Sequence, residues 1–224
     1  MEKRFGGEYA RRAAMTLFGV LVSAFSVGLF SHSGMGVDPF QVLAQSLGRH
    51  AEAGLGIGYG TFYTILNLVM VVGVFFWDRS KIGLATVMNI FLVGHVAAFS
   101  EGLMRQLFPD PALPVRIGLL AVGVVVMCFG SAFYFTGDLG VSTYDAVALT
   151  LSERTDRKYF KFIRIATDLI CVGTGWLLGG ADKIHVGTII TALFMGPLIS
   201  LFRRCAAEPF RYGRRPVSGS DPRP

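Results

Sequence analysis

The sequence is poor in charged residues and in cysteine. Only 16% of its 224 residues are Asp, Glu, Lys or Arg, whereas about 25% are charged in an ordinary soluble domain. None of its three cysteines lies at metal-ligand spacing from another, and none is placed for an exported disulfide. These shortages argue against a soluble globular domain, a zinc site and a disulfide-stabilised secreted fold.

Catalytic motifs are also missing. The sequence has no nucleophile elbow, no phosphate-binding lysine loop and no His-Glu-x-x-His run. GLGIGYG (54–60) resembles a dinucleotide-binding fingerprint, but it precedes a long apolar run instead of following a strand. The isolated His95 and His185 have no second ligand at metal-binding spacing. We therefore expect no enzyme activity, no metal and no cofactor.

Long apolar runs are what the chain does have. Hydrophobic residues make up 52% of it, and about 20 apolar residues suffice to cross a bilayer. The fifth of six such runs is the weakest, because Arg164 and Asp168 lie inside it. A cleavable signal peptide is disfavoured, because the first run is long and no A-x-A-like site ends it. The predicted transmembrane helices are 13–31, 59–77, 82–100, 117–136, 160–178 and 184–202.

The basic residues predict an orientation. Cytoplasmic loops of membrane proteins carry an excess of Lys and Arg. With the N-terminus inside, sixteen basic residues fall on the cytoplasmic side and four on the other. Anionic lipid headgroups can hold such residues, so the net charge of +6 requires no nucleic-acid partner. We expect both termini in the cytoplasm, and a disordered basic tail over 205–224, which is rich in Pro, Gly, Ser and Arg.

Two windows of the sequence occur twice. GVDPFQV (36–42) aligns with GVSTYDA (140–146) at an offset of 104 residues. KIGLATVMNIFLVG (81–94) aligns with KIHVGTIITALFMG (183–196) at an offset of 102. The windows follow the same order in both halves, which predicts two copies of a three-span unit.

The two copies are expected to span 1–107 and 108–204. Two consecutive units of three spans enter the membrane from opposite sides, so the predicted fold is an all-α membrane protein built from two inverted repeats. Many secondary transporters share this plan and bind substrate near the bilayer midplane, between the repeats.

Each copy of the first window predicts a short helix, over 39–49 and 143–153. Asp38 is a good N-cap before Pro39, and Ser142 or Thr143 takes that role in the second copy. Ten to twelve residues extend roughly 15–18 Å, about half a bilayer. Such a helix either lies along the interface or dips into the membrane and returns, and the sequence leaves both arrangements open.

Polar residues inside the apolar runs are the main candidates for function. Asn67 and Asp168 each lie eight residues into a run, about 12 Å from its start. Ionisable groups at that depth are costly and usually functional, so Asp168 is expected to bind solute or to couple a cation or proton to its movement. Alternatively, Arg164 neutralises Asp168 one helical turn away, and Asn67 makes only an interhelical hydrogen bond. The complete predicted solute site is Asp38, Gln41, Asn67, Ser142, Thr143, Asp145 and Asp168.

Three stretches resemble the YczE/YyaS/YitT-like group of bacterial integral membrane proteins. They are GMGVDPFQVLAQSLG (34–48), GDLGVSTYDAVALTLSERT (137–155) and KIHVGTIITALFMGP (183–197). The resemblance covers nearly the whole chain except the tail. It implies a bacterial inner-membrane location and six spans, and it supplies no catalytic residues.

The favoured hypothesis is a small secondary transporter or exporter of a small polar or amphipathic solute. The alternative is a membrane scaffold or regulator that holds a partner protein at the cytoplasmic face through its basic loop and tail. Membrane lipids are expected contacts in either case. A homodimer is compatible with the size of the chain, but no residue predicts one.

Overall fold

The computed structural model describes residues 2–155 and 160–212, and within these ranges the chain is helical with no strand. The all-α fold expected from the sequence is confirmed. The α-helices are α1 (Glu2–Ser33), α2 (Pro39–Leu55), α3 (Tyr59–Trp77), α4 (Leu84–Leu107), α5 (Leu113–Gly137), α6 (Thr143–Thr155), α7 (Phe160–Leu177), α8 (Val186–Phe202) and α9 (Glu208–Tyr212). Short 3₁₀ turns η1 (Arg79–Lys81) and η3 (Gly180–Lys183) precede α4 and α8, and a π-helix, η4 (Arg203–Ala207), precedes α9.

Four helical segments are long and apolar enough to cross a membrane, and they match the first four predicted spans. They are Gly7–Ser33, Tyr59–Trp77, Leu84–Leu107 and Leu113–Gly137. The described apolar part of α7, Ile165–Leu177, is shorter, and α8 has 17 residues. The six-span count therefore stays a prediction.

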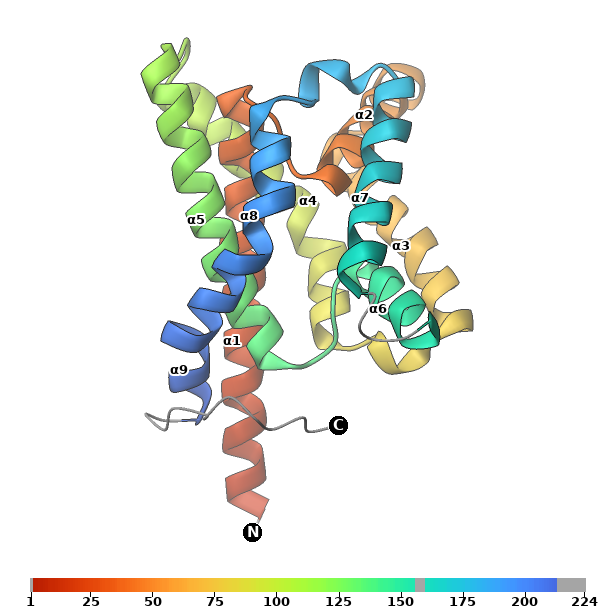
Figure 1. The fold of residues 1–224 in the computed structure, drawn as a ribbon, viewed down its shortest axis with the longest axis vertical. Coiled ribbons are helices and arrows are strands. Elements are labelled where there is room, and N and C mark those ends of the chain that lie inside the picture. The colour runs from red at the N-terminus through yellow and green to blue at the C-terminus, as the bar shows by residue number, and fades with distance from the viewer. Residues whose placement is uncertain (1, 156–159, 213–224) are drawn as a thin grey trace.

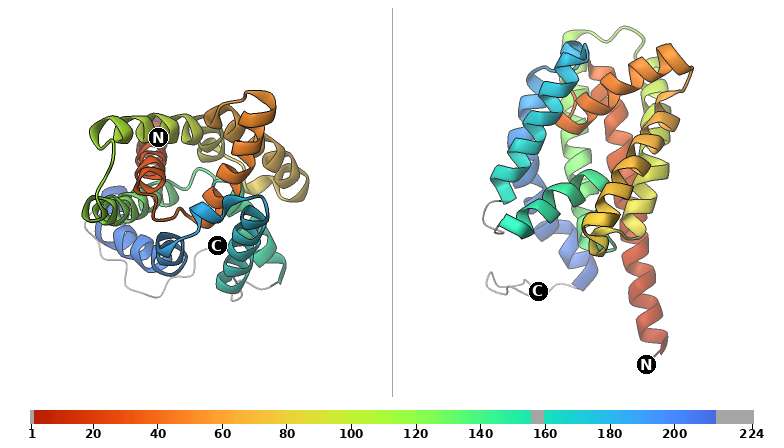
Figure 2. Two further views of the ribbon diagram at one scale, coloured as in Figure 1. Left: turned by 90° about the horizontal axis from the view of Figure 1, so that it is seen from above. Right: turned by 90° about the vertical axis from the view of Figure 1, so that its right-hand side faces the viewer.

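The helices form two bundles (Figure 1). In the first, called here the long bundle, α1 packs against α4 and α5, and α5 packs against α8. In the second, called the short-helix bundle, α2 and α6 each pack against both α3 and α7. Contacts between α3 and α4 join the bundles, and the view from above in Figure 2 shows the short-helix bundle beside the long one. Each bundle thus draws helices from both halves of the chain.

The second half repeats the element order of the first: a long helix, a short helix, a helix, a 3₁₀ turn and a helix. The halves also exchange backbone hydrogen bonds at matching positions. The loop after α1 bonds the chain around the start of α8, and the loop after α5 bonds the chain around the start of α4. The exchanged bonds are Val37 N–H to Lys183 C=O (3.3 Å), Val141 N–H to Lys81 C=O (3.3 Å), Gly187 N–H to Met35 C=O (2.7 Å) and Ala85 N–H to Leu139 C=O (2.9 Å).

Two arginines exchange caps in the same way. Nε of Arg12, near the start of α1, donates to the Gly137 carbonyl at the end of α5 over 2.9 Å. Nε of Arg116, near the start of α5, donates to the Ser33 carbonyl at the end of α1 over 2.6 Å. Cations at helix C-termini satisfy the last carbonyls and complement the helix dipole. Arg12 and Arg116 are 104 residues apart, and so are Ser33 and Gly137. The two caps are therefore equivalent under the repeat found in the sequence.

Helix α2 begins as predicted but ends later. Asp38 accepts the Gln41 N–H at 3.3 Å as N-cap, and Pro39 occupies the first turn. The helix runs past the predicted end at residue 49 to Leu55, where Gly56 adopts a left-handed φ of 66° and terminates it. The first turn is buried, whereas Leu55 is 74% exposed. The helix therefore starts inside the molecule and reaches the surface at its far end.

A long-range ion pair lies at the predicted end of α2. Arg49 donates to both carboxylate oxygens of Asp182 in η3, at 2.9 and 2.8 Å. Burial raises the pKa of Asp182, but the Arg49 hydrogen bonds and charge outweigh that effect and hold the pKa below its ordinary value. This contact spans 133 residues of the chain, so local sequence signals cannot report it.

The predicted disordered tail is wrong for its first residues. Residues 205–212 are helical, in η4 and α9, and Arg211 is buried against α5 with its Nη1 bonded to the Thr136 carbonyl. A long-range contact therefore orders a segment whose composition favours disorder. Residues 213–224 lie outside the described residues.

Close packing of α1 on α5 leads to a first prediction. A Cβ added at Gly130 would lie 2.7 Å from the Ser23 nitrogen and 2.8 Å from the Gly19 oxygen, both on α1. Gly130→Ala is therefore expected to destabilise the protein by about 1–3 kcal/mol, the usual cost of overpacking. At Gly118, on the same helix, a Cβ meets nothing within 4 Å, and Gly118→Ala should stabilise by up to about 1 kcal/mol. Thermal unfolding in detergent compares the two, and equal effects would contradict the packing explanation.

Candidate functional site

Polar side chains from three helices converge on the start of α6. Asn67 of α3 is fully buried, with 1% of its surface exposed. Its Oδ1 accepts the Thr143 hydroxyl, and its Nδ2 donates to the Tyr63 carbonyl at 2.8 Å. A buried amide needs such partners, because an unpaired one costs about 1–3 kcal/mol. Asn67 thereby joins α3 of the first half to α6 of the second.

Asp168 of α7 meets the neighbouring residue of α6. The Tyr144 hydroxyl donates to Asp168 Oδ1 and lies 3.4 Å from the Thr167 hydroxyl. Asn67 and Asp168, which the repeat predicts to be equivalent, therefore contact consecutive residues of one helix. The side chain of Arg164 lies outside the described residues, so the alternative Arg164–Asp168 pair stays untested.

Asp145 completes the cluster from within α6. Its Oδ2 accepts the Tyr134 hydroxyl of α5 at 2.6 Å and the Ser142 hydroxyl at 2.7 Å. The Asp145 N–H donates back to Ser142 Oγ at 3.1 Å. Of the two predicted cap residues, Ser142 makes the capping bond, and Thr143 reaches Asn67 instead. We call Asn67, Thr143, Tyr144, Asp145 and Asp168 the α6 cluster.

The start of α2 meets the α6 cluster through aromatic rings. Phe40 stacks on Tyr144 with ring centroids 4.9 Å apart and an interplanar angle of 16°. The two residues occupy equivalent positions in the repeated windows, at the offset of 104. The neighbouring Gln41 accepts the Tyr59 hydroxyl through Oε1. The first turns of the two short helices are therefore in contact. Phe40 of α2 supplies an apolar ring, and the first turn of α6 also makes the polar contacts described above.

The structure brings together most of the predicted site, but not all of it in one network. Asn67, Ser142, Thr143, Asp145 and Asp168 surround the first turn of α6. Asp38 caps α2, and Gln41 is hydrogen-bonded to Tyr59. The sequence did not predict Tyr144 of the α6 cluster or the aromatic residues that contact the cluster, which are Phe40, Tyr63 and Tyr134. Phe40 and Tyr144 could have been found, because both stand inside the repeated windows.

The α6 cluster offers carboxylates, hydroxyls, an amide and aromatic faces. A few convergent polar groups among apolar walls are typical of small-molecule sites, and aromatic rings beside carboxylates also suit cationic groups. Within residues 2–155 and 160–212, no three His, Cys, Asp or Glu side chains lie where they could share a metal ion.

Comparison with known proteins gives the family of the chain. The family described as "Family of unknown function (DUF6198)" matches residues 10–204, which include both bundles and the α6 cluster. The chain belongs to this family.

Two relatives resemble this chain over most of their length. An uncharacterized protein of Haemophilus influenzae is 26% identical over 197 residues, covering 87% of this chain and 84% of the relative. The uncharacterized membrane protein YczE of Bacillus subtilis is 25% identical over 185 residues, covering 81% and 80%. No solved structure matches the chain. The expected YczE-like relationship is confirmed, and with the four apolar helices it identifies a membrane protein.

Proposed function

We propose that the protein is a small secondary transporter that binds a small polar or amphipathic solute at the α6 cluster. The supporting observation is that Asn67 of the first half and Asp168 of the second half both hydrogen-bond the first turn of α6. Buried polar residues in membrane proteins are expensive and usually serve function. Their position between the halves is where repeat-built transporters bind substrate.

The proposal includes six spans arranged as two inverted repeats in the bacterial inner membrane. The exchanged backbone bonds and arginine caps support the repeat, because each has a counterpart in the other half. The excess of basic residues on one side supports cytoplasmic termini. In this arrangement α2 and α6 dip into the membrane from opposite sides, and their first turns meet at the Phe40–Tyr144 stack.

The two bundles suggest how the solute site would open. Close glycine contacts and the arginine caps hold α1 and α5 together as a frame. The short-helix bundle carries the α6 cluster. If α6 shifts against α3 and α7, the Thr143–Asn67 and Tyr144–Asp168 hydrogen bonds open, and a solute can accept or donate in their place. A typical hydrogen bond contributes only about 1 kcal/mol net, so this exchange costs little when the solute supplies matching groups.

A panel of small metabolites tests the proposal by thermal unfolding of the purified protein in detergent. A ligand that binds only the folded state stabilises it by about 2.7 kcal/mol at a hundred times its Kd. Thr143→Val, which removes the hydroxyl donated to Asn67, is expected to lose this response. Thr64→Val on α3 is the matched control, because the Thr64 hydroxyl bonds only the Gly60 and Ile90 carbonyls.

The result that contradicts transport is equally specific. If no metabolite shifts the wild type, or if Thr143→Val responds as fully as Thr64→Val, the cluster is structural. The scaffold hypothesis would then gain support. Its own test is removal of residues 213–224, a truncation that keeps the buried Arg211 in place.

A further inference from the structure

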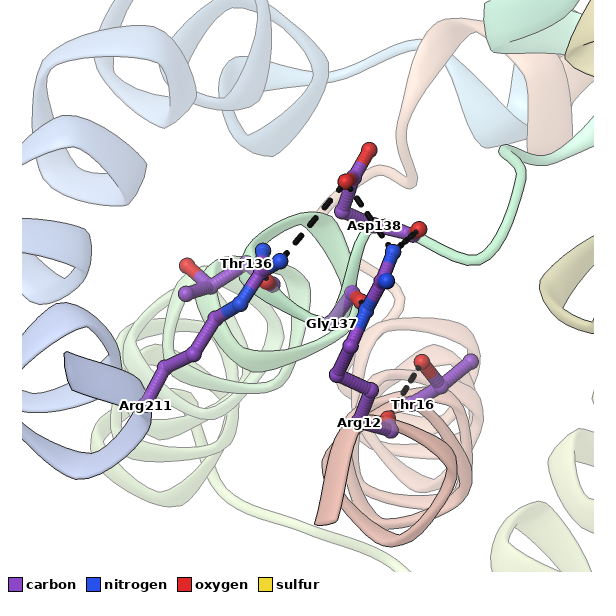
Figure 3. Close-up of polar contacts among 6 residues, drawn as sticks. All are labelled: Arg12, Thr16, Thr136, Gly137, Asp138 and Arg211. Atoms are coloured by element: carbon purple, nitrogen blue, oxygen red, sulfur yellow. Dashed lines mark hydrogen bonds and ion pairs between the residues drawn. The ribbon is translucent and has the colours of Figure 1, made fainter. Parts of the chain in front are cut away.

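The two arginine-capped helix ends are not alike, although the repeat makes them equivalent. At the end of α1, Arg116 caps Ser33 and Gly34. At the end of α5, Arg12 caps Gly137 and Asp138, and Arg211 of α9 joins it. Figure 3 shows both guanidinium groups reaching Asp138. Helix capping explains the arginine found at both ends. It does not explain Asp138 and Arg211, which are present only at the end of α5.

Asp138 is the first additional group. It adopts a left-handed φ of 54°, and its counterpart Gly34 has a φ of 60°. Aspartate is one of the few residues besides glycine that adopt this conformation, because its short polar side chain can hydrogen-bond locally. The Asp138 carboxylate lies 3.0 Å from Arg12 Nη2 and 3.7 Å from Arg211 Nη2. It therefore holds the two arginines at one place.

A pocket of about 220 Å³ opens beside this group. Its lining residues are Phe135, Thr136, Asp138, Arg203, Glu208, Arg211 and Tyr212. Two polar atoms of the lining, Thr136 Oγ1 and Arg211 Nε, are buried without a hydrogen-bond partner. Thr136 is 3% exposed and Arg211 9%. Buried polar atoms are nearly always hydrogen-bonded, so these two atoms, both on residues that line the pocket, lack a partner that such atoms normally have.

The charges around the pocket indicate what that partner is. Among the lining residues, Arg203 and Arg211 balance Asp138 and Glu208. Arg12 lies outside the lining but pairs with Asp138 at 3.0 Å, and it brings the group to one positive charge in excess. Arg203 is half exposed and contacts Glu208 only loosely, at 3.5 Å. Guanidinium groups bind phosphate through paired, charge-assisted hydrogen bonds, and phosphate oxygens also accept from hydroxyls. The preceding π-helix agrees with a functional role, because such helices are frequent at functional sites.

We propose that this pocket binds a phosphate group, through Arg203, Arg211 and Thr136. The group can come from an anionic lipid headgroup or from a soluble phosphate. The surroundings suit a lipid, because the exposed Phe210 lies at a tilt against Phe133 of α5, with ring centroids 5.9 Å apart, and extends the apolar surface of that helix. Basic pockets between helices on the cytoplasmic side are typical headgroup sites. This site lies in the long bundle and is independent of the proposed solute site.

The test uses full-length protein stripped of lipid in a neutral sugar detergent. Dioleoyl phosphatidylglycerol, a neutral dioleoyl glycolipid and inorganic phosphate are titrated separately while thermal unfolding is followed. Phosphatidylglycerol or inorganic phosphate should raise the unfolding temperature of the wild type, and the glycolipid should not. Arg203→Gln and Thr136→Val should bind about tenfold or more weakly, since each loses a hydrogen bond to a charged group.

Arg105→Gln is the matched control, because Arg105 is an exposed arginine paired with Glu101 as Arg203 is with Glu208. Thr136→Val removes an unpaired hydroxyl, so without ligand it should unfold no earlier than the wild type. A response to phosphatidylglycerol alone assigns a headgroup, and a response to inorganic phosphate assigns a soluble phosphate. The proposal is overturned if neither ligand acts, if the glycolipid acts equally, or if both pocket variants respond like Arg105→Gln.

Discussion

Gly140→Ala is expected to destabilise the protein by about 2–5 kcal/mol. Gly140 adopts a φ of 95°, and an added Cβ would lie 2.6 Å from the Gly83 nitrogen and 2.7 Å from its Cα. Both atoms belong to backbone that the Val141–Lys81 and Ala85–Leu139 hydrogen bonds hold in place, so neither can move aside. Backbone strain of about 1–2 kcal/mol adds to an overpacking cost of about 1–3 kcal/mol.

Gly179→Ala separates the two contributions. Gly179 also has a left-handed φ, 79°, but a Cβ there meets nothing within 4 Å. This variant should lose only the strain, about 1–2 kcal/mol. The yield of folded protein after detergent extraction and its unfolding temperature compare the two variants. If Gly179→Ala is as damaging as Gly140→Ala, close contact between the halves is not what stabilises this loop.

Asp168→Asn is expected to reduce solute transport at least tenfold without lowering the amount of folded protein. An asparagine keeps the size of the side chain and an oxygen for the Tyr144 hydroxyl, but it loses the negative charge. Hydrogen bonds to charged groups contribute about 1.5–3 kcal/mol, and 1.4 kcal/mol corresponds to a tenfold change in affinity. Uptake into proteoliposomes, with the solute that the thermal panel identifies, measures the effect.

Asp110→Asn is the control for the loss of charge. Asp110 is exposed between α4 and α5, so its substitution should change neither uptake nor unfolding. A different pattern would refute the role of Asp168 in transport. If Asp168→Asn lowers the folded yield while uptake per folded molecule is unchanged, the carboxylate only supports the packing of α6 on α7.

Local signals in the sequence predict the helices well. The apolar runs mark α1, α3, α4 and α5, and the Asp38–Pro39 pair marks the start of α2. These features depend on neighbouring residues, which propensity and capping describe. The order of residues 205–212 was predicted wrongly, because Arg211 binds a partner far away in the sequence. The end of α2 was placed six residues too early, before the local stop signal at Gly56.

The site was predictable in part for a similar reason. Asn67 and Asp168 stand out because polar residues are rare within apolar runs. The tyrosines that bond the cluster do not stand out, because aromatic residues are common in such runs and a hydroxyl partner becomes visible only in three dimensions. The sequence shows Arg12 and Arg116 as basic residues next to apolar runs. It does not show that they cap helix ends, because the carbonyls that they bind lie 125 and 83 residues away.

The exchanged backbone bonds also constrain how the chain can fold during synthesis. The Val37 N–H bonds the carbonyl of Lys183, which the ribosome adds roughly 150 residues later, after some 7–30 s at typical rates of translation. For that interval the turn at Gly34 and Gly36 lacks this backbone partner, although α1 and α3 are already synthesised. We therefore expect the N-terminal half to depend on insertion factors or chaperones until α8 arrives, and truncated chains that end before Lys183 to be degraded quickly.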